Sequence, residues 1–105
     1  MAIAWATETT VEEDHATLAV AGELDIATAP RLRGTVGDLM GQGVRHIEID
    51  LDGCTFIDST GMGALLWASH RLQAVGGDLC ALHVHGAPAE AIAIAGLDHV
   101  IPMRN

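Results

Sequence analysis

Asp58, Ser59 and Thr60 place a carboxylate and two hydroxyls between an apolar segment, "CTFI" (54–57), and a segment with a helical pattern. A serine at such a junction has two chemical uses. It can cap the helix, which is worth about 1 kcal/mol relative to alanine. It can also carry a phosphoryl group, because the free N–H groups and partial positive charge of a helix N-terminus favour an anion. The local pattern alone favours the capping role, with Ser59 at or near the N-cap.

A third use, as the nucleophile of a hydrolase, is weakly supported. The neighbours of Ser59 read "FIDSTGM" and do not form a G-x-S-x-G elbow. A nucleophile also needs a base that a third group orients, and the spacing directs none of His70, His83 or His85 toward Ser59. We therefore expect a protein that is not an enzyme.

Metal and cofactor sites are also poorly indicated. His83 and His85 would share one side of a strand, with His46 on a neighbouring strand, but no fourth ligand is apparent. The "GMG" at 61–63 lacks the lysine and the spacing of a phosphate-binding loop and the third glycine of a dinucleotide turn. The prediction is no metal and no cofactor.

The elements that would position these residues alternate between strand and helix patterns, which is typical of an α/β domain. Thr28 and Pro30 suit a helix start, and Gly96 suits a helix end. We predict strands over 2–8, 16–24, 45–51, 79–85 and, at an edge, 99–102, and helices over about 28–41, 60–75 and 88–95.

The strands alternate apolar and polar residues instead of being apolar throughout. Ile47, Ile49 and Leu51 would share one face of the third strand, opposite His46, Glu48 and Asp50. A sheet covered on both faces would have nearly continuous apolar strands. We therefore predict a mixed sheet of four to five strands with helices mainly on one face, and not a doubly wound nucleotide-binding fold.

Composition limits the functions further. The chain has 105 residues, enough for one domain (1–105), and its net charge is −9 with only five Lys and Arg. Nucleic acids and anionic membranes would repel it, whereas a protein with a basic surface would attract it.

There is no signal peptide or membrane-length apolar stretch, and Cys54 and Cys80 lack metal-ligand spacing, so a cytoplasmic protein with reduced thiols is expected.

One further motif, "GELD" at residues 22–25, ends the second predicted strand. If the second and third strands are neighbours, the end of this motif would lie at the same edge of the sheet as Ser59. Functional sites often gather at such an edge.

Three stretches together resemble the STAS-domain family, of the anti-sigma-factor antagonist type. They are "VAGELDIATAPRLR" (20–33), "RHIEIDLDGCTFIDSTGMGALLWASHRLQAVGGDL" (45–79) and "AIAGLDHVIP" (93–102). Their order and separation match the family over nearly the whole chain. The resemblance implies a mixed sheet with helices largely on one side, in agreement with the alternation of the strands.

The resemblance also implies partner switching. Unphosphorylated, such a protein binds an anti-sigma factor that is also a serine kinase, and so frees a sigma factor. The kinase phosphorylates the serine after the aspartate, here Ser59, and a PP2C-type phosphatase reverses this. The partner surface would comprise Asp58, Ser59, Thr60, Gly61 and Met62, with Gly22, Glu23, Leu24 and Asp25 on the adjacent rim.

Thr60 departs from the family pattern, because many relatives have a second serine there. Its hydroxyl is therefore an alternative acceptor of the phosphoryl group. STAS domains also occur in anion transporters and sensory complexes, so a scaffold or sensor subunit of a larger assembly is the alternative function. The acceptor hydroxyl and the absence of a membrane or sensor segment in the sequence favour a free-standing antagonist.

Overall fold

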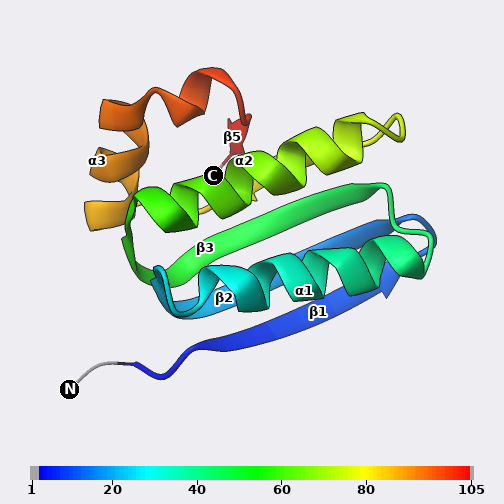
Figure 1. The fold of residues 1–105 in the computed structure, drawn as a ribbon, viewed down its shortest axis with the longest axis horizontal. Helices are drawn as coiled ribbons and strands as arrows, with labels where there is room; N and C mark the ends of the chain where they lie inside the picture. Colours follow the sequence, from blue (N-terminus) through cyan, green and yellow to red (C-terminus); the bar gives the residue numbers. More distant parts are fainter. Residues whose placement is uncertain (1–2, 105) are drawn as a thin grey trace.

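The computed structural model describes residues 3–104 as a five-stranded sheet with three α-helices and one short 3₁₀ turn (Figure 1). The elements in chain order are β1 Ala6–Glu12, β2 His15–Leu24, α1 Ala29–Gly41, β3 His46–Ile57, α2 Ser59–Gln73, β4 Asp78–Leu82, α3 Gly86–Ala95, η1 Leu97–His99 and β5 Met103–Arg104.

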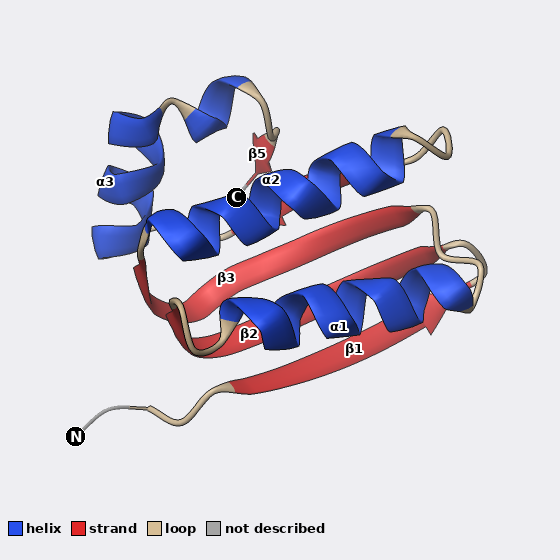
Figure 2. Ribbon diagram, viewed as in Figure 1, coloured by secondary structure: helices blue, strands red, loops and turns tan. Residues whose placement is uncertain are grey.

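The sheet follows chain order, β1-β2-β3-β4-β5, with β1 antiparallel to β2 and every other pair parallel. Each parallel connection runs through a helix to the neighbouring strand. Because such crossovers are almost always right-handed, strands added in one direction place their helices on one face. Figure 2 shows α1 and α2 side by side on that face. The predicted one-sided α/β architecture is confirmed.

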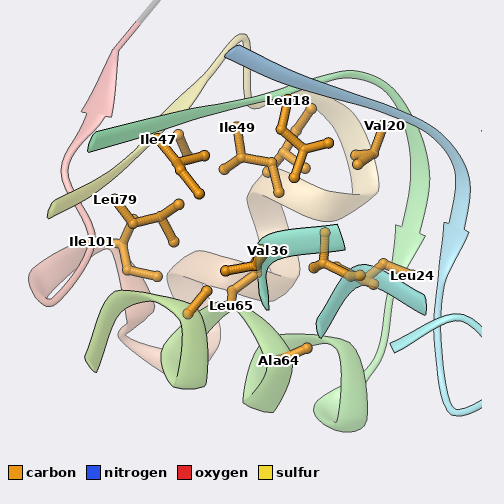
Figure 3. Packing of buried hydrophobic residues seen from close by; sticks show 14 of the residues in the cluster. Leu18, Val20, Leu24, Val36, Ile47, Ile49, Ala64, Leu65, Leu79 and Ile101 are labelled. Atoms are coloured by element: carbon orange, nitrogen blue, oxygen red, sulfur yellow. The ribbon is translucent and has the colours of Figure 1, made fainter. Parts of the chain in front are cut away.

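The core lies between this face and the helices. Leu18, Ile47 and Ile49 are at most 1% exposed and point toward Val36 of α1 and Leu65 of α2 (Figure 3). The alternation read from the sequence thus has the predicted orientation in β2 and β3. The opposite face of the sheet, which we call the open face, presents His15, Thr17 and Ala19 of β2 and His46, Glu48 and Asp50 of β3.

β4 is shorter than the predicted strand over 79–85, and its residues do not alternate between buried and exposed. It ends at Leu82, and His83 has a positive φ of 55°, so His83 and His85 do not share a strand. Its helix-facing residues are Leu79 and Ala81, which pair in register with Ile47 and Ile49. Cys80, whose side chain lies on the face opposite to Leu79 and Ala81, is also buried, so both faces of this short strand are covered. Apolar and polar residues do not alternate in a strand that is buried on both faces.

Other boundaries shift as well. The first predicted strand begins at residue 2, outside the described residues, whereas β1 starts at Ala6. β3 continues to Ile57 because its last residues pair with the end of β2. The prediction of a strand over 99–102 is wrong, because Leu97–His99 form a 3₁₀ turn and the edge strand β5 comprises Met103–Arg104.

The predicted helix termini are partly confirmed. Thr28 is the N-cap residue of α1 and Gly96 ends α3 with a left-handed φ of 73°. The Thr28 side chain does not cap the helix, however. Its hydroxyl donates to the Glu23 carbonyl at 2.7 Å and so ties the start of α1 to the end of β2.

Candidate functional site at the ends of β2 and β3

The "GELD" motif and the Asp-Ser-Thr segment are neighbours in space. β2 and β3 are parallel, so their carboxyl ends reach the same edge of the sheet, where Leu24 pairs with Ile57. The Asp58 N–H donates to the Leu24 carbonyl at 3.2 Å. We call this edge, formed by residues 22–25 and 58–62, the rim.

Asp58, not Ser59, is the N-cap of α2. Its backbone is extended (φ −100°, ψ −175°), and its Oδ1 accepts from the Gly61 N–H at 2.8 Å. Its carbonyl accepts from the Met62 N–H at 2.9 Å. The prediction that Ser59 caps the helix is therefore wrong by one position, since aspartate caps as well as serine does.

Ser59 is the first helical residue of α2, and its side chain is exposed. Within residues 3–104, no side-chain hydrogen bond involves its hydroxyl. The helix therefore does not need this group for its cap, and a substituent on the oxygen would leave the Asp58–Gly61 hydrogen bond in place.

Three residues of the rim are buried and hold its shape. Leu24 is fully buried, and Gly61 allows the first turn of α2 to lie directly against the Leu24 backbone. Gly22 has a φ of 99°, and an added Cβ would stand 3.1 Å from the Ile3 carbonyl oxygen and the Trp5 Cα. Gly22, Leu24 and Gly61 therefore determine the shape of the predicted surface, but their own atoms are buried.

The remaining predicted residues reach solvent to different degrees. Asp25 is half-buried, because its carboxylate accepts from the N–H groups of Ala27 (2.9 Å) and Thr28 (3.1 Å) and so shapes the turn into α1. Glu23 is exposed, while Thr60 and Met62 are half-buried. A partner approaching the rim would therefore meet Glu23 and Ser59 most directly.

Sequence reasoning missed two apolar side chains at this edge. Ile26, directly after the "GELD" motif, is 74% exposed, and Phe56 of β3, which pairs with Glu23, is 45% exposed. Exposed apolar groups at one edge are typical of interaction surfaces. The exposure of Ile26 could have been predicted, because this residue lies between turn residues in the sequence. The exposure of Phe56 could not, because it depends on the register of β2 and β3.

Neither the histidine set His46, His83 and His85 nor a Ser59 nucleophile gains support from the geometry. The three histidines considered as a metal set each pair with a different carboxylate: His46 with Asp78, His83 with Asp50 and His85 with Asp52. Among the hydrogen bonds of residues 3–104, none joins a histidine to Ser59, so no base for a nucleophile is in place. In the same range, no helix is long and apolar enough to cross a membrane.

The described fold and rim define a STAS domain. The model of the STAS domain family matches residues 6–105, and the chain belongs to this family. The resemblance seen in the sequence motifs is confirmed.

Individual relatives agree with this assignment. The chain is 30% identical over 90 residues to the anti-sigma-B factor antagonist of Staphylococcus aureus (strain NCTC 8325 / PS 47), covering 86% of this chain and 83% of the relative. It is similar in structure to an anti-sigma factor antagonist from Mycobacterium paratuberculosis, with a TM-score of 0.85, 24% identity and coverage of 96% and 86% of the two chains. It is also similar to the Bacillus cell fate determinant SpoIIAA in its phosphorylated form, with a TM-score of 0.72, 24% identity and coverage of 97% and 92%.

Proposed function

We propose that this protein is an anti-sigma factor antagonist switched at Ser59. Unmodified, it binds an anti-sigma factor and so frees a sigma factor in the cytoplasm. The anti-sigma factor acts as a serine kinase, phosphorylates Ser59 and releases the antagonist, and a PP2C-type phosphatase restores the binding form. The proposal rests on one observation: among the described residues, the exposed hydroxyl of Ser59 makes no side-chain hydrogen bond, and it lies at the same end of the sheet as the "GELD" segment.

The relatives support this proposal through what they are called. The Staphylococcus aureus relative is named an anti-sigma-B factor antagonist, and the Bacillus structure is described as a phosphorylated form. Neither description concerns this chain. The support that this chain itself provides is its Asp-Ser-Thr-Gly sequence at the start of a helix.

The physical chemistry of the rim explains how a phosphate would act. A phosphoryl group adds about −1.5 to −2 charges and would sit at the positive end of α2, where it is tolerated. It would also follow Asp58 directly in the chain, at the same end of the sheet as the exposed apolar residues Ile26 and Phe56. Burying such a charge against a partner costs several kcal/mol unless it is paired, so binding through this surface would be lost.

Binding measurements with the cognate anti-sigma factor test the proposal. We expect Ser59→Ala to bind as the wild type does and Ser59→Asp to bind at least about tenfold more weakly, which corresponds to about 1.4 kcal/mol. Thr9→Asp is the matched control, because it adds the same charge at an exposed hydroxyl position of β1, outside the rim, and should bind normally.

Equal affinity of Ser59→Asp and wild type would contradict the switch. Stable co-purification of the protein in a high-mass complex without any anti-sigma factor would instead support the scaffold or sensor function.

A further inference from the structure

A cluster of two histidines and a carboxylate lies on the open face, at the end of the sheet opposite the rim. Asp14 belongs to the β1–β2 turn, His15 begins β2 and His46 begins β3. One ligand atom from each of these three residues lies within 4.8 Å of the other two. The first residues of β2 and β3 are neighbours because His15 and His46 are register partners in the parallel pair.

The backbone holds this cluster in place. Glu13 takes a positive φ of 57° in the tight turn between β1 and β2. The Asp14 carbonyl then accepts two hydrogen bonds from the start of β3, from the Arg45 N–H at 2.8 Å and the His46 N–H at 3.0 Å. Asp14 is therefore fixed to the strand that carries His46, although the two residues are 32 positions apart.

The side chains converge on the Asp14 carboxylate. Its Oδ1 lies 2.8 Å from His15 Nδ1, and its Oδ2 lies 3.9 Å from His46 Nε2. The two imidazole rings stack with their centroids 4.5 Å apart and their planes inclined by 20°. Both rings thus bring nitrogen to one carboxylate.

A second carboxylate sets the orientation of His46. Asp78, at the start of β4, places Oδ1 2.8 Å from His46 Nδ1. In the tautomer that donates the Nδ1 proton to Asp78, Nε2 keeps its lone pair, and this nitrogen lies 3.9 Å from Asp14 Oδ2. This arrangement, in which a carboxylate holds the distal nitrogen of a histidine, is the one that supports histidine ligands in metal sites.

We propose that Asp14, His15 and His46 form a binding site for a divalent transition metal of the Zn²⁺ class, with Asp78 as the positioning residue. Two imidazoles and one carboxylate are a donor set that Zn²⁺ accepts, with a fourth position for water or an external ligand. Ca²⁺ and Mg²⁺ prefer oxygen ligands and are disfavoured here. The net charge of −9 favours cation capture in general.

Metal binding requires rotation of exposed side chains, because the two stacked rings do not yet direct their in-plane nitrogen lone pairs at one point. Ligand atoms at about 2.0–2.2 Å from a tetrahedral Zn²⁺ stand roughly 3.3–3.6 Å apart. Atoms now up to 4.8 Å apart would approach by up to about 1.5 Å, and His15 Nδ1 and Asp14 Oδ1, now 2.8 Å apart, would separate slightly. The side chains of His15 and Asp14 are 68% and 50% exposed and are free to move by this amount. The metal would lie away from Ser59, and the inference does not depend on the proposed function.

Calorimetric titration of the tag-free full chain with ZnCl₂ tests this site. We expect one Zn²⁺ per chain with micromolar affinity, and at least tenfold weaker binding for His46→Ala and for Asp14→Asn. Asp78→Asn should also weaken binding about tenfold or more, as loss of a supporting carboxylate does. Titration with Co²⁺ should give the absorption bands of a tetrahedral site in the wild type.

The matched control is His83→Ala. His83 also lies near a carboxylate, with Nδ1 3.0 Å from Asp50 Oδ1, but it belongs to no cluster of three ligands among the described residues. This variant should bind Zn²⁺ as the wild type does. Absence of stoichiometric binding would overturn the proposal, and so would equal weakening by His46→Ala and His83→Ala, which would indicate diffuse binding to surface histidines.

Discussion

Gly61 at the start of α2 lies directly against the backbone of Leu24 at the end of β2. A Cβ on Gly61 would collide with the Leu24 carbonyl oxygen and would stand 2.8 Å from the Leu24 Cγ. Leu24 is fully buried, so it has no room to move away. This contact joins the "GELD" motif to the Asp-Ser-Thr-Gly motif and sets the shape of the rim.

Gly61→Ala is therefore expected to lower the free energy of unfolding by about 1–3 kcal/mol, the usual cost of overpacking. Gly63→Ala is the control, because the nearest atom to its added Cβ is the flexible Arg33 Nη2 at 3.9 Å. That variant should be neutral or more stable by up to about 1 kcal/mol, since alanine favours helix. Urea denaturation of both proteins measures the difference, and similar stabilities would show that the contact is unimportant.

Asp58 and Ser59 should differ in their effect on stability. Asp58→Ala removes the hydrogen bond to the Gly61 N–H and should cost about 1 kcal/mol, as loss of an N-cap does. Ser59→Ala removes an exposed hydroxyl and should change stability by less than about 0.5 kcal/mol. Denaturation curves of the two variants compare them directly. A larger loss for Ser59→Ala than for Asp58→Ala would assign the cap to the serine.

The Cys54 thiol should be unreactive in the folded protein. Burial raises the pKa of this thiol, and this outweighs the hydrogen bonds that lower it. Because only the thiolate reacts, modification by a disulfide reagent at pH 8 should be slow in buffer and rapid in denaturant. Rapid labelling of Cys54 in native buffer, located by peptide mapping, would show that the end of β3 opens.

The same pKa shift has a consequence at high pH. A thiol with a raised folded-state pKa contributes stability that is fully present below its unfolded pKa of about 8.5 and is lost as the pH rises through the folded value. Cys54→Ala should therefore show a shallower loss of stability above about pH 8.5 than the wild type. Identical slopes for the two proteins would count against this coupling.

Asp50 on the open face should contribute to stability at the acid end. Burial opposes ionisation, but the Asp52 N–H at 3.0 Å and the His83 ring outweigh it and lower the pKa of Asp50. The stabilisation is present above the unfolded pKa of about 3.9 and is lost as the pH falls through the lowered folded value. Asp50→Asn should thus lose more stability at pH 6 than at pH 3, measured by urea denaturation. A loss independent of pH would contradict this account.

The position of the rim could be predicted from the sequence, because it depends only on local residue patterns and on the order of the strands along the chain. Alternation in β2 and β3 identified the helix-facing residues, and the two motifs mark the ends of neighbouring parallel strands. The cap was misassigned by one residue because Asp58 and Ser59 are equally good N-caps and only the extended backbone at Asp58 distinguishes them.

The open face was much less predictable. β4 stops at Leu82, where the chain turns through a positive φ at His83, a residue type that gives no strong turn signal. The cluster of Asp14, His15 and His46 depends on the register between β2 and β3, and the sequence shows nothing of that register. Three residues from two distant segments become neighbours only when the sheet has formed.

The central claim is that Ser59 is the switch, and mapping of the phosphorylated residue tests it most directly. The purified protein is incubated with ATP and the cognate anti-sigma factor, and its intact mass and peptides are measured by mass spectrometry. We expect one phosphoryl group per chain, located on Ser59, with no modification of Ser59→Ala and normal modification of Thr60→Ala. A phosphoryl group on Thr60, or an unmodified chain after incubation with every cognate kinase of the source organism, would contradict the account.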